Sequence, residues 1–211
     1  MDVKNLPGFA PKTLKGDSVY YEILHWAAGQ LKDVPGLTCE IGLRMGGGTE
    51  SIVQGSIDAG DPRVHVAIDP YGDIEYRMSG RTCRMDYTNQ MKVEALAEIY
   101  AWFKAKGREF LFFNMEDTEF FRRFADGVPV YDRKKTLVNS YALVHVDGPH
   151  AVGDVRRAIE FFTPRTPLGG IWVFDDVNMY PHEELVPILT SAGMWLEILT
   201  GRKIAYRRMS L

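Results

Sequence analysis

Acidic residues stand directly after several short apolar stretches of this sequence, where they could bind a ligand together. Asp69 follows VHVAI, Asp147 follows YALVHV, and Asp175-Asp176 follow GGIWVF. If these stretches are parallel strands, their carboxyl ends meet at one edge of a sheet, which is where open α/β proteins bind ligands. An acid after the second strand can accept hydrogen bonds from a ribose diol. The remaining carboxylates are hard oxygen ligands for a cation such as Mg²⁺.

A glycine-rich turn follows the first apolar stretch, in the sequence EIGLRMGGG over residues 40–48. Its spacing is E-x-G-x-x-x-G. Glycines let backbone amides approach a ligand closely and relieve a sharp strand-to-helix turn. The turn lacks the closely paired glycines of the dinucleotide fingerprint and the Gly-Lys-Ser/Thr of a phosphate loop. Pyrophosphate and nucleoside triphosphate ligands are therefore disfavoured.

One histidine is placed to act as a base. His150 lies three residues after Asp147, in the motif DGPH, and histidine can take a proton from a hydroxyl because its pKa lies near working pH. A cation bound to the nearby acids would lower the pKa of the same hydroxyl. His65 and His145 lie within apolar stretches, so we expect them to be structural. His182 follows the aspartate pair and is a second candidate for a base or a binding residue.

The elements that must position these residues follow from the apolar pattern. Strands of near-continuous apolar character alternate with amphipathic segments, which is typical of a parallel sheet covered on both faces. The first strand is expected to begin at Leu37, and the others to lie in residues 64–70, 109–115, 141–150 and 169–177. Helices are expected over Val19–Val34, capped by Asp17-Ser18, around Ile52 and Ile57, and over residues 91–107, 118–127, 152–162 and 181–192.

The end of the chain departs from this alternation. Residues 194–200 and 203–209 are separated only by Gly201-Arg202, which is too short for a crossover and suits a hairpin. We therefore predict an α/β fold with one doubly wound, Rossmann-like sheet, mostly parallel and closed by an antiparallel hairpin strand. We expect residues 1–211 to form a single domain, with residues 1–17 as an N-terminal arm.

Composition narrows the setting. The chain of 211 residues has a net charge of −3. It therefore lacks the excess of Lys and Arg that binds the phosphates of nucleic acids, and nucleic acid is not expected as a partner. Cys39 and Cys83 form no CxxC pair, which favours a reduced compartment. No signal-like segment or apolar run of membrane-spanning length is present, so we expect a soluble, cytoplasmic protein without membrane contact.

Four motifs together resemble those of class I methyltransferases that use S-adenosylmethionine, in particular the macrocin and mycinamicin sugar O-methyltransferases. They are the E-x-G-x-x-x-G-G turn, IDPYG, VDGPH and GGIWVFDDV, and they span about Leu37 to Val177. The resemblance implies that Glu40, Gly42 and Gly46 surround the methionine part of the cofactor, that Asp69 holds its ribose and that Met115 lies near its adenine. We add Gly47 of the same turn to the cofactor-binding set.

The same resemblance implies a divalent cation, usually magnesium, at Asp147, Asp175 and Asp176, with His150 as the general base. We therefore expect an O-methyltransferase that acts, with Mg²⁺, on a hydroxyl of a small molecule or a saccharide. A metal-independent methyltransferase with another acceptor, an NAD-dependent oxidoreductase and a noncatalytic binding protein are the alternatives. Enzymes of this type often borrow part of the acceptor pocket from a neighbouring subunit, so a homo-oligomer is an open expectation. Acceptor selectivity is expected in the arm and in residues 71–86 and 178–182.

Overall fold

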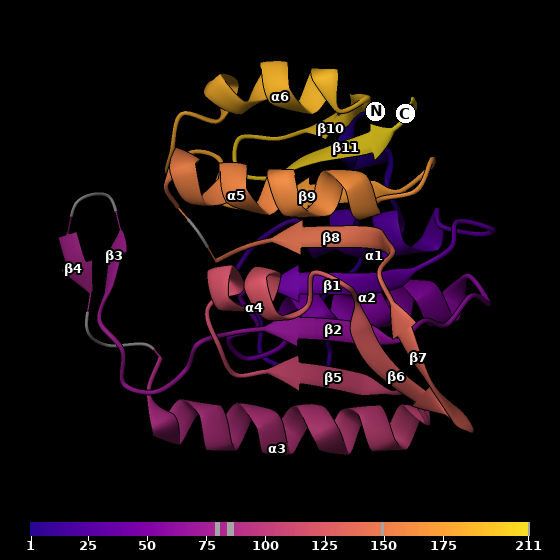
Figure 1. Ribbon diagram of the computed structural model, residues 1–211, viewed down its shortest axis with the longest axis vertical. Helices are drawn as coiled ribbons and strands as arrows, with labels where there is room; N and C mark the ends of the chain where they lie inside the picture. Colours follow the sequence, from indigo (N-terminus) through magenta and orange to yellow (C-terminus); the bar gives the residue numbers. More distant parts are fainter. Residues whose placement is uncertain (79–80, 84–86, 149, 211) are drawn as a thin grey trace.

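A seven-stranded sheet organises the chain (Figure 1). The computed structural model describes residues 1–78, 81–83, 87–148 and 150–210. The strand order is β10-β11-β9-β8-β1-β2-β5, and the five strands from β9 to β5 are parallel, which confirms the predicted fold. The strands are β1 Leu37–Ile41, β2 His65–Ile68, β5 Phe110–Phe113, β8 Tyr141–Val146, β9 Ile171–Phe174, β10 Met194–Leu199 and β11 Ile204–Arg208.

The C-terminal hairpin is present, and it folds back into the sheet. Strand β11 pairs antiparallel with β10 on one side and with β9 on the other, so β10 becomes the edge strand. The pairing of Ile204 with Phe174 places the start of β11 beside the end of β9. The residues just before β11 are therefore brought next to the acids that follow β9.

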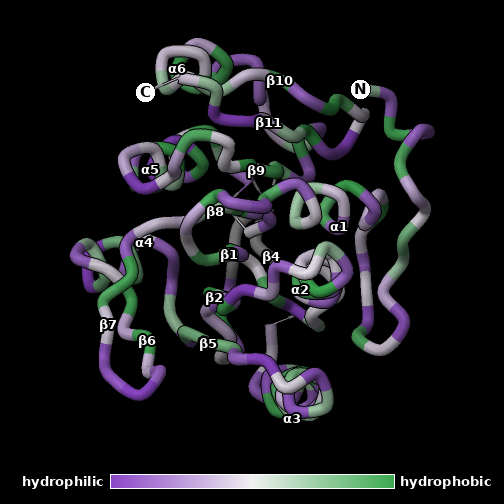
Figure 2. The backbone as a smooth tube through the Cα atoms, turned by 90° about the vertical axis from the view of Figure 1, so that its right-hand side faces the viewer, coloured by the Kyte–Doolittle hydropathy of each residue, from purple (hydrophilic) through white to green (hydrophobic). Residues whose placement is uncertain are grey.

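Three helices cover each face of the sheet (Figure 2). Helices α1, α2 and α3 pack on one face and α4, α5 and α6 on the other, as a doubly wound fold requires. Among the described residues, no helix combines the length and the apolar character of a membrane span. The helices are α1 Tyr21–Gly29, α2 Gly47–Asp58, α3 Asn89–Lys106, α4 Asp117–Arg123, α5 Val152–Phe162 and α6 Val186–Ser191, with 3-10 turns η1 Val3–Asn5, η2 Thr163–Arg165 and η3 His182–Leu185.

Helix α1 is shorter than the predicted Val19–Val34. It begins at Tyr21, after Tyr20 with a φ of 60°, and no side chain caps it. The hydroxyl of Ser18 donates to Asp175 instead of capping the helix. The predicted cap was wrong because a tertiary partner competes for that side chain.

Two small hairpins were not predicted. Strands β3 Tyr76–Met78 and β4 Arg81–Cys83 lie between β2 and α3, and β6 Val128–Asp132 and β7 Lys134–Val138 precede β8. Every residue of β7 except Val138 is exposed. A strand without a buried face lacks the alternation that reveals strands in a sequence. The segment at residues 71–86 that was predicted to select the acceptor lies partly outside the described residues.

Candidate functional site

Ionisable side chains lie in a row across neighbouring strands on the face covered by α1, α2 and α3, which we call the ionisable face. Glu40 of β1 is in register with His145 of β8, which is in register with Val173 of β9. Side chains alternate along a strand, so Asp147 and Asp175, two residues further on, continue the row. Asp147 and Asp175 leave neighbouring parallel strands, as the sequence predicted.

A pocket of about 220 Å³ opens at this end of the ionisable face. The glycine turn forms one wall, and Asp17, Ser18 and Tyr21 form another. Residues that follow β8 and β9 also line the pocket, together with Tyr87 and Arg202. Of the predicted site residues, those that line it are Glu40, Gly42, Gly47, Asp147, His150 and Asp176, whereas Gly46, Asp69, Met115 and Asp175 do not. Pro149 of the DGPH motif lies outside the described residues.

Glu40 is held in a buried polar network beneath the first turn of α2. Its carboxylate accepts a hydrogen bond from Thr49 Oγ1 at 2.5 Å and contacts His145 Nδ1 at 2.8 Å. Thr49 also contacts His65, whose other ring nitrogen contacts Thr38 at 2.9 Å. Burial lowers the pKa of His65 to about 4, so this ring is neutral at pH 7. His65 is therefore structural, as predicted.

Gly48, outside the predicted set, is what lets Glu40 reach the pocket. A Cβ atom at Gly48 would collide with the Glu40 carboxylate, so no larger residue fits above it. At Gly42, where φ is +91°, a Cβ atom would lie 2.6 Å from the Asp147 carbonyl oxygen. Both glycines let the backbone come close to the acids. The predicted approach of the backbone amides to a ligand stays a prediction.

Asp69 shapes the glycine turn from below. One of its oxygens, Oδ2, accepts hydrogen bonds from the backbone amides of Leu43 and Arg44, each at 2.9 Å. The other oxygen, Oδ1, is buried and has no hydrogen-bond partner among the described residues. Burial raises the pKa of this carboxyl to about 7, although the two amides work against the rise. The Asp69 side chain is fully buried.

Gly46 and Met115 were predicted to contact the cofactor, but neither lines the pocket. Gly46 precedes α2 with a φ of +88° and forms an isolated bridge to Lys15 of the N-terminal segment. Met115 packs against the core on the face covered by α4, α5 and α6. Neither residue meets the pocket, so a contact with a cofactor would require the surrounding chain to move.

His150 is paired with an acid. Its Nε2 lies 3.0 Å from Asp176 Oδ2, and Arg202 Nε lies 2.6 Å from Asp176 Oδ1. The hydrogen bond from His150 and the charge of Arg202 lower the pKa of Asp176. If Nε2 carries the hydrogen that Asp176 accepts, Nδ1 keeps a lone pair and can serve as a base.

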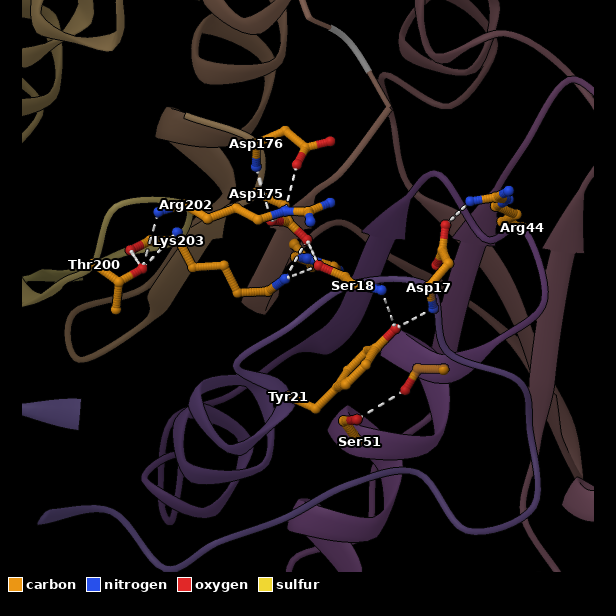
Figure 3. Close-up of polar contacts among 12 residues, drawn as sticks. Asp17, Ser18, Tyr21, Arg44, Ser51, Asp175, Asp176, Thr200, Arg202 and Lys203 are labelled. Carbon is orange, nitrogen blue, oxygen red and sulfur yellow. Dashed lines mark hydrogen bonds and ion pairs between the residues drawn. The ribbon is translucent and has the colours of Figure 1, made fainter. Parts of the chain in front are cut away.

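Asp175 is fully buried and ion-paired with Lys203, whose side chain is also fully buried (Figure 3). The Lys203 ammonium donates to Ser18 Oγ at 2.7 Å, and that hydroxyl donates to Asp175 Oδ2 at 2.7 Å. The remaining oxygen, Oδ1, accepts the backbone amide of Asp176 at 2.8 Å. Both oxygens of Asp175 therefore have partners within the protein.

Asp147 differs from the other two acids. Its carboxylate lines the pocket and has no hydrogen-bond partner among the described residues. Burial, followed by the nearby charge of Asp175, raises its pKa well above the ordinary value. Ligand atoms of His145, Asp147 and Asp175 lie within 4.8 Å of one another, and His145 Nε2 is buried without a partner among the residues described.

The predicted magnesium ligands do not fit that ion with the side chains in this arrangement. Asp147 offers oxygens that have no hydrogen-bond partner among the described residues, but His150 and Arg202 occupy Asp176, and Lys203 occupies Asp175. A divalent cation on Asp175 would share a carboxylate with a buried ammonium, and like charges repel strongly where water is excluded. His145 could add a nitrogen ligand, but it does not remove this repulsion.

His182, the second candidate for a base, is structural. It is buried and does not line the pocket. Its Nε2 lies 3.1 Å from the Tyr206 hydroxyl, and its Nδ1 lies 3.3 Å from the Tyr180 hydroxyl. Burial lowers its pKa to about 4.

Sequence reasoning missed the cations of the site. Arg202 was considered only as part of the hairpin turn, and Lys203 only as the first residue of the strand that follows it. A signal was present, because two adjacent basic residues directly precede the apolar run IAY over residues 204–206. It could be interpreted only once β11 was known to lie beside β9.

A family model described as a methyltransferase domain matches residues 39–177. This match covers more than half of the chain. It includes the glycine turn and the acids that follow β2, β8 and β9. The chain therefore belongs to the methyltransferase domain family and is an enzyme of that class. The resemblance to class I methyltransferases is confirmed. No curated protein matches the chain.

Solved O-methyltransferases share the fold. The O-methyltransferase NovP is 17% identical with a TM-score of 0.58 over 90% of this chain and 79% of its own. The calicheamicin methyltransferase CalS11 is 17% identical with a TM-score of 0.65 over 89% and 77%. TomG from Streptomyces achromogenes, solved with SAM, is 14% identical with a TM-score of 0.60 over 93% and 82%.

Proposed function

We propose that this enzyme transfers a methyl group from S-adenosylmethionine to a hydroxyl of a small molecule or a sugar. The observation that carries the proposal is one pocket in which the glycine turn above Glu40 faces the His150–Asp176 pair. A donor site and a base for the acceptor are thereby combined within a single cavity. The family match and the fold shared with O-methyltransferases support the same reaction class.

The residues present fit the cofactor. Gly48 leaves room above Glu40. Asp69 Oδ1 is buried beneath the turn without a hydrogen-bond partner among the described residues, and a ribose hydroxyl could satisfy it if the turn moves, because Asp69 does not line the pocket. The pocket is smaller than the roughly 300 Å³ that ligand pockets usually offer. We therefore expect Asp17 and Ser18, which form one wall, to move outward when the cofactor binds.

The chemistry required of the protein is modest. S-adenosylmethionine supplies an activated methyl group when it is bound. His150, oriented by Asp176, would take the proton of the acceptor hydroxyl through Nδ1. Asp147, which faces the pocket without a partner among the described residues, would hold the same hydroxyl in line for attack. Magnesium is left out of this mechanism, because two of its three predicted ligands are already paired.

The acceptor is proposed at the level of its chemistry. CalS11 is described as a TDP-rhamnose 3′-O-methyltransferase, and NovP and TomG are described as O-methyltransferases. These descriptions favour a hydroxyl acceptor over the NAD-dependent alternative. A cytoplasmic setting and a homo-oligomer stay predictions.

Calorimetric titration with S-adenosylmethionine and S-adenosylhomocysteine, each with Mg²⁺ and with EDTA, tests the donor site. We expect binding in both conditions. Asp69→Ala should weaken it by about 1 to 3 kcal/mol, since it removes the acceptor for the ribose and for the turn. Asp126→Ala, an exposed acid, is the matched control. Failure of the wild-type protein to bind either compound would refute the proposal.

A second variant tests the base. His150→Gln should leave cofactor affinity unchanged and lower turnover by about 10²- to 10⁴-fold with any accepted hydroxyl compound. Full activity in this variant would show that His150 is not the base, while leaving the donor site intact.

A further inference from the structure

Lys203 is a buried cation placed where the sequence predicted a metal ion. Its side chain is fully buried, at the first position before β11. An ammonium removed from water is costly unless it is paired and hydrogen-bonded, and such a residue therefore points to a charge requirement in its surroundings.

The turn that precedes β11 is built to present this side chain. Thr200 Oγ1 accepts hydrogen bonds from the amide of Lys203 at 2.7 Å and from that of Arg202 at 3.2 Å. The same hydroxyl donates to the Lys203 carbonyl at 2.8 Å. Thr200 thus fixes the backbone from which both cations reach the acids that follow β9.

The partners of Lys203 come from distant parts of the chain (Figure 3). Its ammonium is ion-paired with Asp175, donates to Ser18 Oγ and lies 5.6 Å from the centre of the Tyr21 ring. Ser18 and Tyr21 also line the pocket. Lys203 therefore connects the acids to the segment that closes one side of the cavity.

The charges at this edge nearly balance without any ion. Asp147, Asp175 and Asp176 bring three negative charges together when all are ionised, and like charges in so small a volume repel. Lys203 and Arg202 supply two positive charges, which is the charge of one Mg²⁺ ion. They also occupy the carboxylates of Asp175 and Asp176.

We propose that Lys203, together with Arg202, is the resident counter-charge of these acids and takes the place of a divalent cation in this enzyme. Lys203 is a positioning residue: it holds Asp175 and, through Ser18, the wall of the pocket. The inference rests on the proposed function for the identity of the pocket as a methyltransferase site. The exclusion of a metal ion by Lys203 can be measured without any reaction.

The test is a Mn²⁺ titration followed by electron paramagnetic resonance, in which bound Mn²⁺ loses the signal of the free ion. Wild-type protein should leave Mn²⁺ free. Lys203→Gln keeps a hydrogen-bond donor but not the charge, and it should bind one ion at least about tenfold more tightly than wild type. Adding Asp175→Asn to that variant should abolish the binding. Lys134→Gln, at an exposed lysine, is the matched control.

Two results would overturn the proposal. Tight Mn²⁺ binding by the wild-type protein that disappears in Asp175→Asn would show that Lys203 does not exclude the ion. Absence of binding in both wild type and Lys203→Gln would show that something other than Lys203 excludes it. Lys203→Met, which keeps the length of the side chain without its charge, is the second variant if Lys203→Gln does not fold.

Titration of the wild-type protein with S-adenosylmethionine in EDTA separates this inference from the proposed function. Cofactor binding together with tight Mn²⁺ binding would leave the methyltransferase proposal standing and remove the role of Lys203. Absence of both cofactor and Mn²⁺ binding would refute the donor site while leaving the counter-charge in place.

Discussion

The two faces of the sheet are made from alternate residues of the same strands, yet they do different work. The face covered by α4, α5 and α6, which we call the apolar face, carries residues such as Cys39, Val144 and Trp172. Their immediate neighbours Glu40 and His145 point to the ionisable face. A one-residue shift in register would exchange the two sets, so one pattern specifies both stability and chemistry.

The faces also differ in how their contacts are satisfied. On the apolar face, aromatic rings pack edge to face, for example Tyr141 against Phe162 with ring centres 4.9 Å apart. On the ionisable face, each buried acid requires particular partners, as Asp175 does with Lys203 and Ser18. We therefore expect substitutions on the apolar face to change stability alone, and substitutions near the pocket to change ligand binding.

The largest expected effect is on the apolar face. Phe162→Ala removes a fully buried ring of α5 and should lower the free energy of unfolding by about 3 to 5 kcal/mol, because the cavity cannot collapse completely. Urea unfolding measures this change. Cofactor affinity, titrated where the variant is folded, should match wild type. Leu137→Ala, at an exposed leucine of β7, is the control, and an equal loss in both variants would contradict the comparison.

A smaller effect concerns the buried histidine on the apolar face. The pKa of His182 is lowered from 6.5 to about 4 by burial. Between these values the unfolded chain binds a proton that the folded chain does not, so stability is present above pH 6.5 and is lost as the pH falls toward 4. In His182→Gln, the fall in the free energy of unfolding between pH 7 and pH 4.5 should therefore be about 2 kcal/mol smaller than in wild type.

Urea unfolding at pH 7 and pH 4.5 checks that change. His65→Gln is the counterpart on the ionisable face, because burial lowers the pKa of His65 to a similar value. An unaltered pH dependence in His182→Gln would show that folding does not lower the pKa of this histidine.

The smallest effect concerns the N-terminal segment beside the pocket. The buried carboxylate of Glu50 on α2 accepts hydrogen bonds from three successive backbone amides, those of Lys12, Thr13 and Leu14, at 2.9, 3.0 and 2.6 Å. Glu50→Gln removes the charge and one acceptor, so stability should fall by about 1 kcal/mol.

Limited trypsin digestion measures the release of this segment. Cleavage after Lys12 and Lys15 should be faster in Glu50→Gln than in wild type. Glu94→Gln, at an exposed acid of α3, should not change it. Equal cleavage in all three proteins would mean that other contacts hold the segment.

Much of the fold could be predicted because its signals are local. The strands of the parallel sheet are short apolar runs, and an acid stands directly after β2, β8 and β9 in the sequence itself. Since parallel strands end at one edge, the convergence of Asp147 and Asp175 followed from the class of fold alone. The closing hairpin followed from a connection too short for anything else.

The polar hairpin β6–β7 shows the limit of such local signals, because its strands are mostly exposed and gain little from burial. Asp69 shows a second limit. Its position after β2 was predictable, but its use in fixing the amides of Leu43 and Arg44 depends on how two loops meet.

The sequence by itself determined the alternation of faces, the glycine turn and the acids at the strand ends, since each depends on residues that are neighbours in the chain. Only the tertiary structure decided that β11 enters between β9 and β10, and therefore that Lys203 meets Asp175 and Ser18. Those partners are 28 and 185 residues away from Lys203. The physical reason is that a charge pair is specified by distance in space, and no local pattern records which cation will neutralise which acid.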